Sequence, residues 1–246
     1  MTRTIRNLLL LSVALGALVL TASAQYSTNT LIPEADTFVR FGINQNVNYG
    51  SLEFLDLYGN GTARDYFAYV RFNLSALPPE AQIMDATLQF TKVTGGTRND
   101  TLTTGRFRVL GLNDVPSNTP QNWDELTLTF DTRGDEWVSA NTFDPARVTD
   151  LDEADEVADN TTGIASIGGP ALVNFLTTRR AAGGLVTFIV DFATTEAGRG
   201  FAFGSRENSN PDARPQLTVA WIPEPAMPAL MALGAFLLLA WHRRVR

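Results

Sequence analysis

The sequence predicts an all-β fold, a jelly-roll-like β-sandwich with one short helix. Three observations point to it. Short segments rich in aromatic and branched residues alternate with Gly/Asn turns between residues 35 and 78. Residues 84–91 alternate between apolar and polar side chains, and residues 185–192 form a nearly continuous apolar run. About nine or ten such strands with no internal repeat are typical of two packed β layers.

The stretch 35–78 holds three of these strands, at 35–40, 52–58 and 66–75. In the third strand, successive side chains point to opposite faces. One face carries Tyr66, Ala68, Val70 and Phe72, and the other carries Phe67, Tyr69 and Arg71. Because both faces are largely apolar, this strand is expected to be covered on both sides.

Strand signals recur at 106–112, 126–130, 201–204 and 216–221. Residues 131–169 lack a regular pattern, which predicts a long surface insertion with room for one helical turn at 153–157. The helix is predicted at 170–180, because Pro170 suits its first turn, two arginines suit its last turn, and Gly183-Gly184 follows.

The N-terminal residues 1–24 have the pattern of a signal peptide. Arg3 and Arg6 precede an uncharged run at 8–20, and the small residues Ala22 and Ala24 predict cleavage by signal peptidase before Gln25. The alternative is an N-terminal membrane anchor, but spanning a bilayer takes roughly 20 apolar residues. The sequence therefore favours export.

The C-terminal residues 223–246 begin with Pro223, Glu224 and Pro225, continue through an apolar run at 226–241, and end in a basic cluster. Such a segment halts in a membrane with its basic end in the cytoplasm. The order of these parts resembles the PEP-CTERM sorting signal of Gram-negative bacteria. The resemblance implies a transient inner-membrane anchor, removal of the tail by an exosortase-type protease, and delivery to the cell surface or extracellular matrix. An ordinary C-terminal anchor is the alternative.

The segment between these ends, 25–222, contains 14 basic and 25 acidic residues, a net charge of −11 against −7 for the whole chain. Nucleic acid is therefore not expected as a partner, because phosphate binding needs clustered Lys and Arg. The chain has no cysteine, and its single histidine, His242, lies in the tail. This excludes Ser-His-Asp and Cys-His catalysis and His- or Cys-ligated zinc from the segment.

Seven motifs occur in an order known from one family. They are 35–40 (ADTFVR), 48–50 (NYG), 68–75 (AYVRFNLS), 83–88 (IMDATL), 123–129 (WDELTLT), 203–208 (FGSREN) and 214–219 (RPQLTV). Together they resemble the DNRLRE-type domain, or carbohydrate-binding module family 96, over residues 31–222. The resemblance implies a β-sandwich of extracellular bacterial proteins, often joined to polysaccharide lyases, with binding to acidic polysaccharides such as alginate in some members.

A sugar-binding module needs exposed aromatic rings that stack on a pyranose. The candidates are Tyr58, Trp123 and Trp137, with Tyr49 as a weaker one. The alternative for each ring is a place in the core. Arg106 and Arg108 lie two residues apart on one predicted strand face and could clamp a carboxylate. Ordinary surface ion pairs are the alternative for both arginines.

Calcium binding is a further hypothesis, because an exported domain meets Ca²⁺ and Ca²⁺ prefers oxygen ligands. Asp36 and Glu207 stand in the first motif and in a late one, and we expect them to form a structural Ca²⁺ site. The alternative is an ion pair of each with Arg40 or Arg206. The acidic run 150–159 lacks the glycine and the distal glutamate of an EF-hand loop, so a solubilising loop is favoured there.

These observations favour an exported, surface-sorted, non-catalytic module that binds extracellular or envelope polysaccharide. One alternative is a structural matrix or surface protein without sugar specificity. The second is a polysaccharide hydrolase or lyase, since carboxylates, tyrosines, arginines and Lys92 remain for acid–base work. No spacing in the sequence singles out a catalytic pair.

Overall fold

The computed structural model describes residues 26–59, 65–94, 104–139, 142–153, 157–158, 163–192 and 199–223. The predicted signal peptide and the tail after Pro223 lie outside these residues. Within the described part, no helix is long and apolar enough to cross a bilayer. Residues 28–221 form one compact unit.

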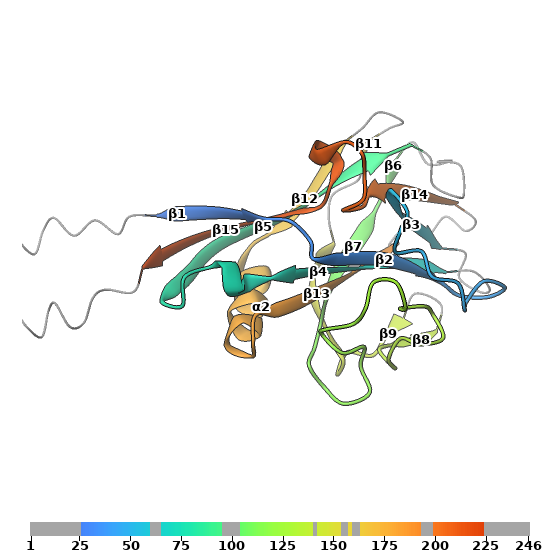
Figure 1. Ribbon diagram of the computed structural model, residues 1–246, viewed down its shortest axis with the longest axis horizontal. Helices are drawn as coiled ribbons and strands as arrows, with labels where there is room; N and C mark the ends of the chain where they lie inside the picture. Colours follow the sequence, from blue (N-terminus) through green and yellow to red (C-terminus); the bar gives the residue numbers. More distant parts are fainter. Residues whose placement is uncertain are drawn as a thin grey trace, which may run out of the picture. The chain divides into compact units, whose positions relative to one another are not determined.

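The described residues fold into β-strands with one α-helix (Figure 1). The longer strands are β1 (Ser27–Leu31), β2 (Ala35–Arg40), β3 (Phe54–Gly59), β4 (Tyr66–Asn73), β5 (Ala81–Val93), β7 (Phe107–Leu112), β10 (Val148–Glu153), β12 (Ile164–Gly168), β13 (Leu185–Phe192), β14 (Arg199–Gly204) and β15 (Gln216–Pro223). The short strands are β6 (Thr104–Gly105), β8 (Trp137–Ser139), β9 (Thr142–Phe143) and β11 (Val157–Ala158). The helix is α2 (Pro170–Ala181). Two 3₁₀ turns are η1 (Leu74–Ala76) and η2 (Pro211–Ala213).

The main sheet has the strand order β1-β15-β5-β14-β3-β4-β13-β7-β10, with β12 paired to β5 and β2 paired to β4. Strand β5 is 13 residues long. Its last residues, Lys92 and Val93, pair with Phe203 and Ala202 of β14. Through this pairing β5 joins β1, β15 and β12 to the other strands of the main sheet. The sheet curls around a common core, which confirms the all-β prediction.

Strand β4 separates two buried clusters, as its alternating pattern predicts. Tyr66, Ala68, Val70 and Phe72 face the main core. Phe67 and Tyr69 face a second, smaller cluster on the other side. Each large apolar side chain buried this way contributes about 1.5–3 kcal/mol relative to an exposed one. The strand is therefore covered on both sides, and it pairs with both β2 and β13.

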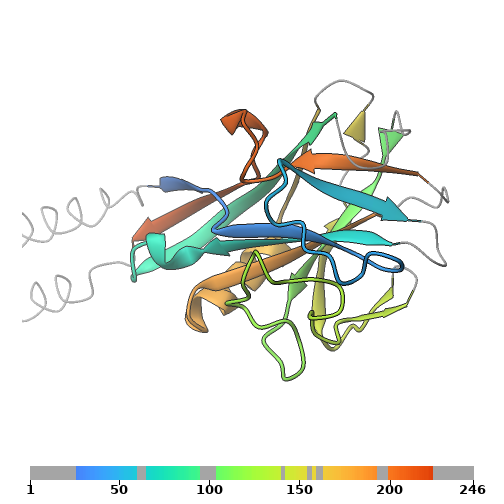
Figure 2. The same cartoon turned by 45° about the vertical axis from the view of Figure 1, so that its right-hand side comes forward.

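The second cluster exists because one long connection folds back over the sheet. Residues 113–147, which we call the covering loop, run from β7 to β10, and the described residues among them are drawn in green to yellow in Figures 1 and 2. Four of its apolar side chains are buried in the second cluster: Trp123, Leu128, Phe130 and Phe143. The expected strand at 126–130 is wrong, since these residues form turns. Leu128, Thr129 and Phe130 are all buried and Leu126 is exposed, so burial does not follow the alternation of the sequence.

The predicted irregular insertion at 131–169 is also wrong in part. β10 pairs with β7 and β12 pairs with β5, so much of this segment extends the main sheet. Acidic residues of β10 obscure its strand pattern in the sequence. The helical turn expected at 153–157 falls partly on residues outside the described part, and its described ends lie in strands.

Helix α2 confirms the prediction at 170–180. Pro170 occupies its first turn, and Arg179 and Arg180 occupy its last turn, where cations favour the helix dipole. Gly183 and Gly184 follow with φ of 120° and 86°, a left-handed backbone that glycine adopts without strain. The buried face of the helix, Leu172, Phe175 and Leu176, packs into the main core.

Candidate metal centre and aromatic face

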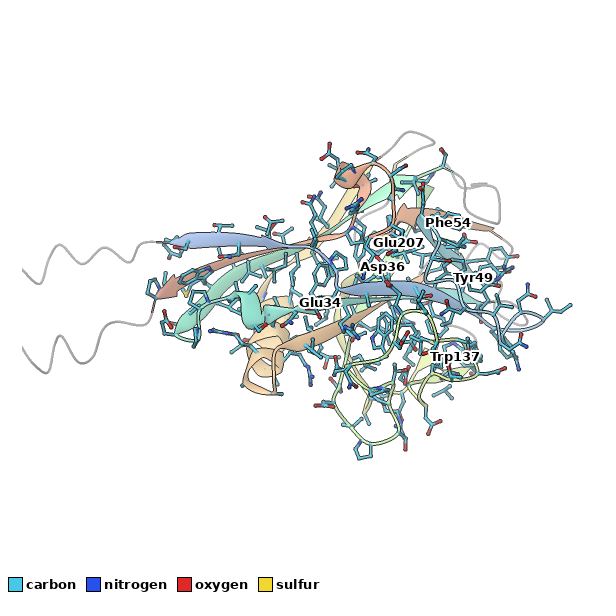
Figure 3. All side chains as sticks on the ribbon, viewed as in Figure 1. Glu34, Asp36, Tyr49, Phe54, Trp137 and Glu207 are labelled. Atoms are coloured by element: carbon cyan, nitrogen blue, oxygen red, sulfur yellow. The ribbon has the colours of Figure 1, made fainter. Side chains whose placement is uncertain are left out.

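Three carboxylates meet at one place in the fold: Asp36 of β2, Glu125 of the covering loop, and Glu207 of the turn after β14. One ligand oxygen from each lies within 4.8 Å of the others. Asp36 is almost fully buried, and the other two are partly buried. Figure 3 shows Asp36 and Glu207 close together in the middle of the molecule. The structure thus brings together the two residues expected to lie near each other, and it adds a third.

Glu125 is held in this cluster by the turn at residues 48–50. The Asn48 side-chain amide donates to the carbonyl oxygens of Glu125 and Leu128, both at 2.8 Å. A Cβ on Gly50 would lie 2.2 Å from the Glu125 carbonyl oxygen, so only glycine permits this approach. The backbone N–H of Asp36 then donates to Glu125 Oε1 at 2.7 Å.

The buried Ser205 positions Glu207. The Ser205 hydroxyl donates to the carbonyl of Leu52 at 2.6 Å and accepts from the N–H of Glu207 at 3.1 Å. The N–H of Arg206 donates to Asp36 Oδ2 at 2.8 Å. This turn therefore fixes both Arg206 and Glu207 against β2.

Among the residues that the structure describes, Arg206 is the one whose guanidinium forms ion pairs with the cluster. Its Nε lies 2.9 Å from Glu207 Oε1, and its NH1 lies 3.3 Å from Glu125 Oε2. Burial raises the pKa of Asp36 well above its usual range, and the charges of Glu207 and Glu125 add to this, while the hydrogen bond from Arg206 N–H opposes it. Burial also raises the pKa of Glu207, with the charge of Glu125 adding to it. Negative charge is in excess here.

Two oxygens of the cluster lack a hydrogen-bond donor among the described residues. They are Asp36 Oδ1 and Glu207 Oε2, and both are buried. A buried acceptor without a donor costs about 1–3 kcal/mol. An all-oxygen set of this kind suits a hard cation such as Ca²⁺.

Sequence reasoning missed Glu125 as a member of the cluster. The only signal was its place in the Trp123-Asp124-Glu125 motif. Its contact with Asp36 crosses 89 positions of the chain. Neither periodicity nor local spacing reports such a contact.

Two of the predicted sugar-stacking rings belong to the core. Tyr58 is 5% exposed and packs at 5.1 Å from Tyr66, measured between ring centroids. Trp123 is 4% exposed, and its indole N–H donates to Thr187 Oγ1 at 3.1 Å. Neither ring is open to solvent, so the prediction that Tyr58 and Trp123 stack on a sugar is wrong. Both rings instead pack in the core, which was the alternative. Tyr49 is partly buried and stacks on Phe38 at 4.4 Å.

Trp137 is partly exposed on β8, at the edge of the second cluster. Its ring lies 5.1 Å from Phe41 and 5.1 Å from Phe130, and the Arg133 guanidinium carbon lies 5.3 Å from the ring centroid. We call Phe41, Arg133 and Trp137, which contact one another around the Trp137 ring, the aromatic face.

The predicted arginine pair is divided between two environments. Arg106 is exposed and precedes the first residue of β7. Arg108 is half-buried and forms an ion pair at 2.8 Å with Asp191, which is buried rather than on the surface as its alternative proposed. Burial raises the pKa of Asp191 to about 6, although Arg108 opposes the shift.

Of the predicted processing residues, Pro223 ends β15. The others lie outside the described residues: Ala22, Ala24, Gln25, Glu224 and Pro225.

Fold and site together define an all-β domain with a buried carboxylate cluster and a partly exposed aromatic face. Residues 27–147 match the model of carbohydrate-binding module family 96. This part of the chain is therefore similar to a carbohydrate-binding module, which supports the resemblance drawn from the motifs, over a shorter range than 31–222. The matched range contains Asp36, Glu125 and Trp137 and ends before Glu207. No curated protein matched the chain.

Proposed function

We propose that this chain is an exported, surface-sorted module that binds extracellular or envelope polysaccharide without catalysis. The observation that carries the proposal is the similarity of residues 27–147 to carbohydrate-binding module family 96. The signal-peptide pattern at 1–24 and the PEP-CTERM-like tail at 223–246 support export and sorting to the cell surface or matrix.

The aromatic face is the surface that we propose for sugar contact. Stacking on the apolar side of a pyranose needs a ring that is fixed by packing yet reaches solvent. Trp137 meets both conditions, because its ring packs against Phe41 and Phe130 while part of the residue stays exposed. The neighbouring Arg133 supplies a guanidinium that can donate to sugar hydroxyl or carboxylate groups.

Affinity-gel retardation of the purified full-length protein in mild detergent tests this function, with alginate and neutral polysaccharides cast in separate gels. We expect retardation by at least one polysaccharide, and we expect Trp137→Ala to weaken it about tenfold, equivalent to roughly 1–1.5 kcal/mol of stacking. Trp221→Ala is the matched control. It removes another partly buried tryptophan, on β15, at the opposite end of the molecule from β8 in Figures 1 and 2.

Three results would contradict the proposal. Passage through every gel without retardation would favour a structural matrix role. Release of reducing ends or of unsaturated products would establish a hydrolase or a lyase. Equal losses of retardation in the Trp137 and Trp221 variants would show that the aromatic face is not where the sugar binds.

A further inference from the structure

We infer that Asp36, Glu125 and Glu207 form a binding site for one Ca²⁺ ion, with Arg206 as the group that competes for it. The inference is independent of sugar binding and rests on three features of the cluster. These are its excess of negative charge, its two buried oxygens without donors, and the incomplete hold of Arg206 on Glu125.

The charge at the cluster is unbalanced. Three carboxylates face one guanidinium, which leaves two negative charges when all three are ionised. Arg71 interacts with Glu34, whose Oε2 lies 4.0 Å from its Nε, and also with Glu125. Counting Glu34 and Arg71 with the cluster leaves the excess at two negative charges, because the two residues carry opposite charges. One divalent cation would balance the cluster. Burying ionised carboxylates without such a partner is costly.

The arrangement of the oxygens indicates where the ion would bind. Asp36 Oδ1 and Glu207 Oε2 are buried, and no described group donates to either of them. Asp36 is 1% exposed, so water gives this carboxylate little compensation. The third oxygen is Glu125 Oε2, which is held by Arg206 at 3.3 Å, longer than a good charge-assisted hydrogen bond.

Arg206 is able to give way to an ion. Its side chain is 37% exposed, so it can turn toward solvent without leaving a cavity in the core. Its backbone N–H would keep its bond to Asp36 Oδ2. Water and backbone carbonyls would complete the six to eight ligands that Ca²⁺ takes, and Ca²⁺ accepts irregular geometry that Mg²⁺ does not.

Such an ion would tie together three parts of the chain that meet only in the folded state. Asp36 lies in β2, Glu125 in the covering loop, and Glu207 after β14. Because the unfolded chain does not hold these carboxylates together, Ca²⁺ would bind the folded state and stabilise it.

Isothermal titration of the chelator-treated full-length protein with CaCl₂ tests the site, together with melting curves with and without Ca²⁺. We expect one ion per chain and a rise in Tm of about 5 °C or more at a hundredfold excess over the Kd. Glu125→Gln should weaken Ca²⁺ binding at least tenfold. Arg206→Gln should strengthen it several-fold, because the competing charge is gone.

Glu80→Gln is the matched control, since it neutralises an exposed glutamate on a turn, outside the cluster. We expect it to leave both the Kd and the Ca²⁺-dependent rise in Tm unchanged. The inference is overturned if neither the native protein nor the Arg206 variant binds Ca²⁺, because Arg206 would then be the permanent counter-charge. It is also overturned if the Glu80 and Glu125 variants lose binding equally. Gel retardation of the same samples reports sugar binding separately, so either proposal can fail alone.

Discussion

A fully buried carboxylate, Glu136, anchors the covering loop to the sheet. Removing the Tyr69 hydroxyl, which donates to this carboxylate, tests how much the anchor contributes to stability. The Tyr69 hydroxyl of β4 donates to Glu136 Oε1. Thr119 Oγ1 donates to the same oxygen at 2.6 Å, and the Thr119 N–H donates to Oε2 at 3.1 Å. Burial raises the pKa of Tyr69 well above its usual value, and the charge of Glu136 adds to this, so the phenol remains a donor.

Tyr69→Phe removes this donor and leaves the ring in place. A hydrogen bond to a charged group contributes about 1.5–3 kcal/mol. For a domain of this size, each kcal/mol lowers Tm by about 2–4 °C, so we expect Tm to fall by about 3–12 °C. Glu136 precedes Trp137 directly, so polysaccharide retardation should weaken as well.

Urea unfolding and melting curves measure the effect, with Tyr26→Phe as the control because Tyr26 is 64% exposed. A double-mutant cycle with Glu136→Gln isolates the pair, and its coupling energy should be at least about 0.5 kcal/mol. A loss of stability below about 0.5 kcal/mol for Tyr69→Phe, equal to that of the control, would refute the anchoring role.

Two further predictions concern the main sheet. Gly111→Ala should lower the free energy of unfolding by about 1–3 kcal/mol, because the new Cβ would lie 2.4 Å from the Phe175 ring. Urea unfolding measures this loss. An unchanged midpoint would contradict the packing of the α2 residue Phe175 on β7. The raised pKa of Asp191, about 6 against 3.8, means that this carboxyl favours folding most below pH 4 and that its contribution is lost as pH rises through 6. Asp191→Asn should therefore reduce the loss of stability between pH 4 and 7 by about 3 kcal/mol, measured by urea unfolding at each pH, and parallel pH profiles for both proteins would refute it.

The local residue pattern was sufficient to predict those strands and helices whose signal lies within their own sequence. The alternation at 66–75 predicted both covered faces of β4, and Pro170 with Gly183-Gly184 predicted the bounds of α2. These features depend on periodicity and backbone preference, which neighbouring residues determine. The same approach failed at 126–130, where the alternation belongs to turns of the covering loop.

The sequence by itself determined the all-β class, the helix at 170–180, and a chemistry without cysteine or a histidine in residues 25–222. Only the tertiary structure decided which aromatic rings reach solvent, burying Tyr58 and Trp123 and leaving Trp137 partly exposed. It also decided that Glu125 joins Asp36 and Glu207. The reason is chain separation. The hydrogen bonds that join Asp36 to Glu125 and to Arg206, the neighbour of Glu207, span 89 and 170 positions, and they form only when the covering loop and the turn after β14 meet β2.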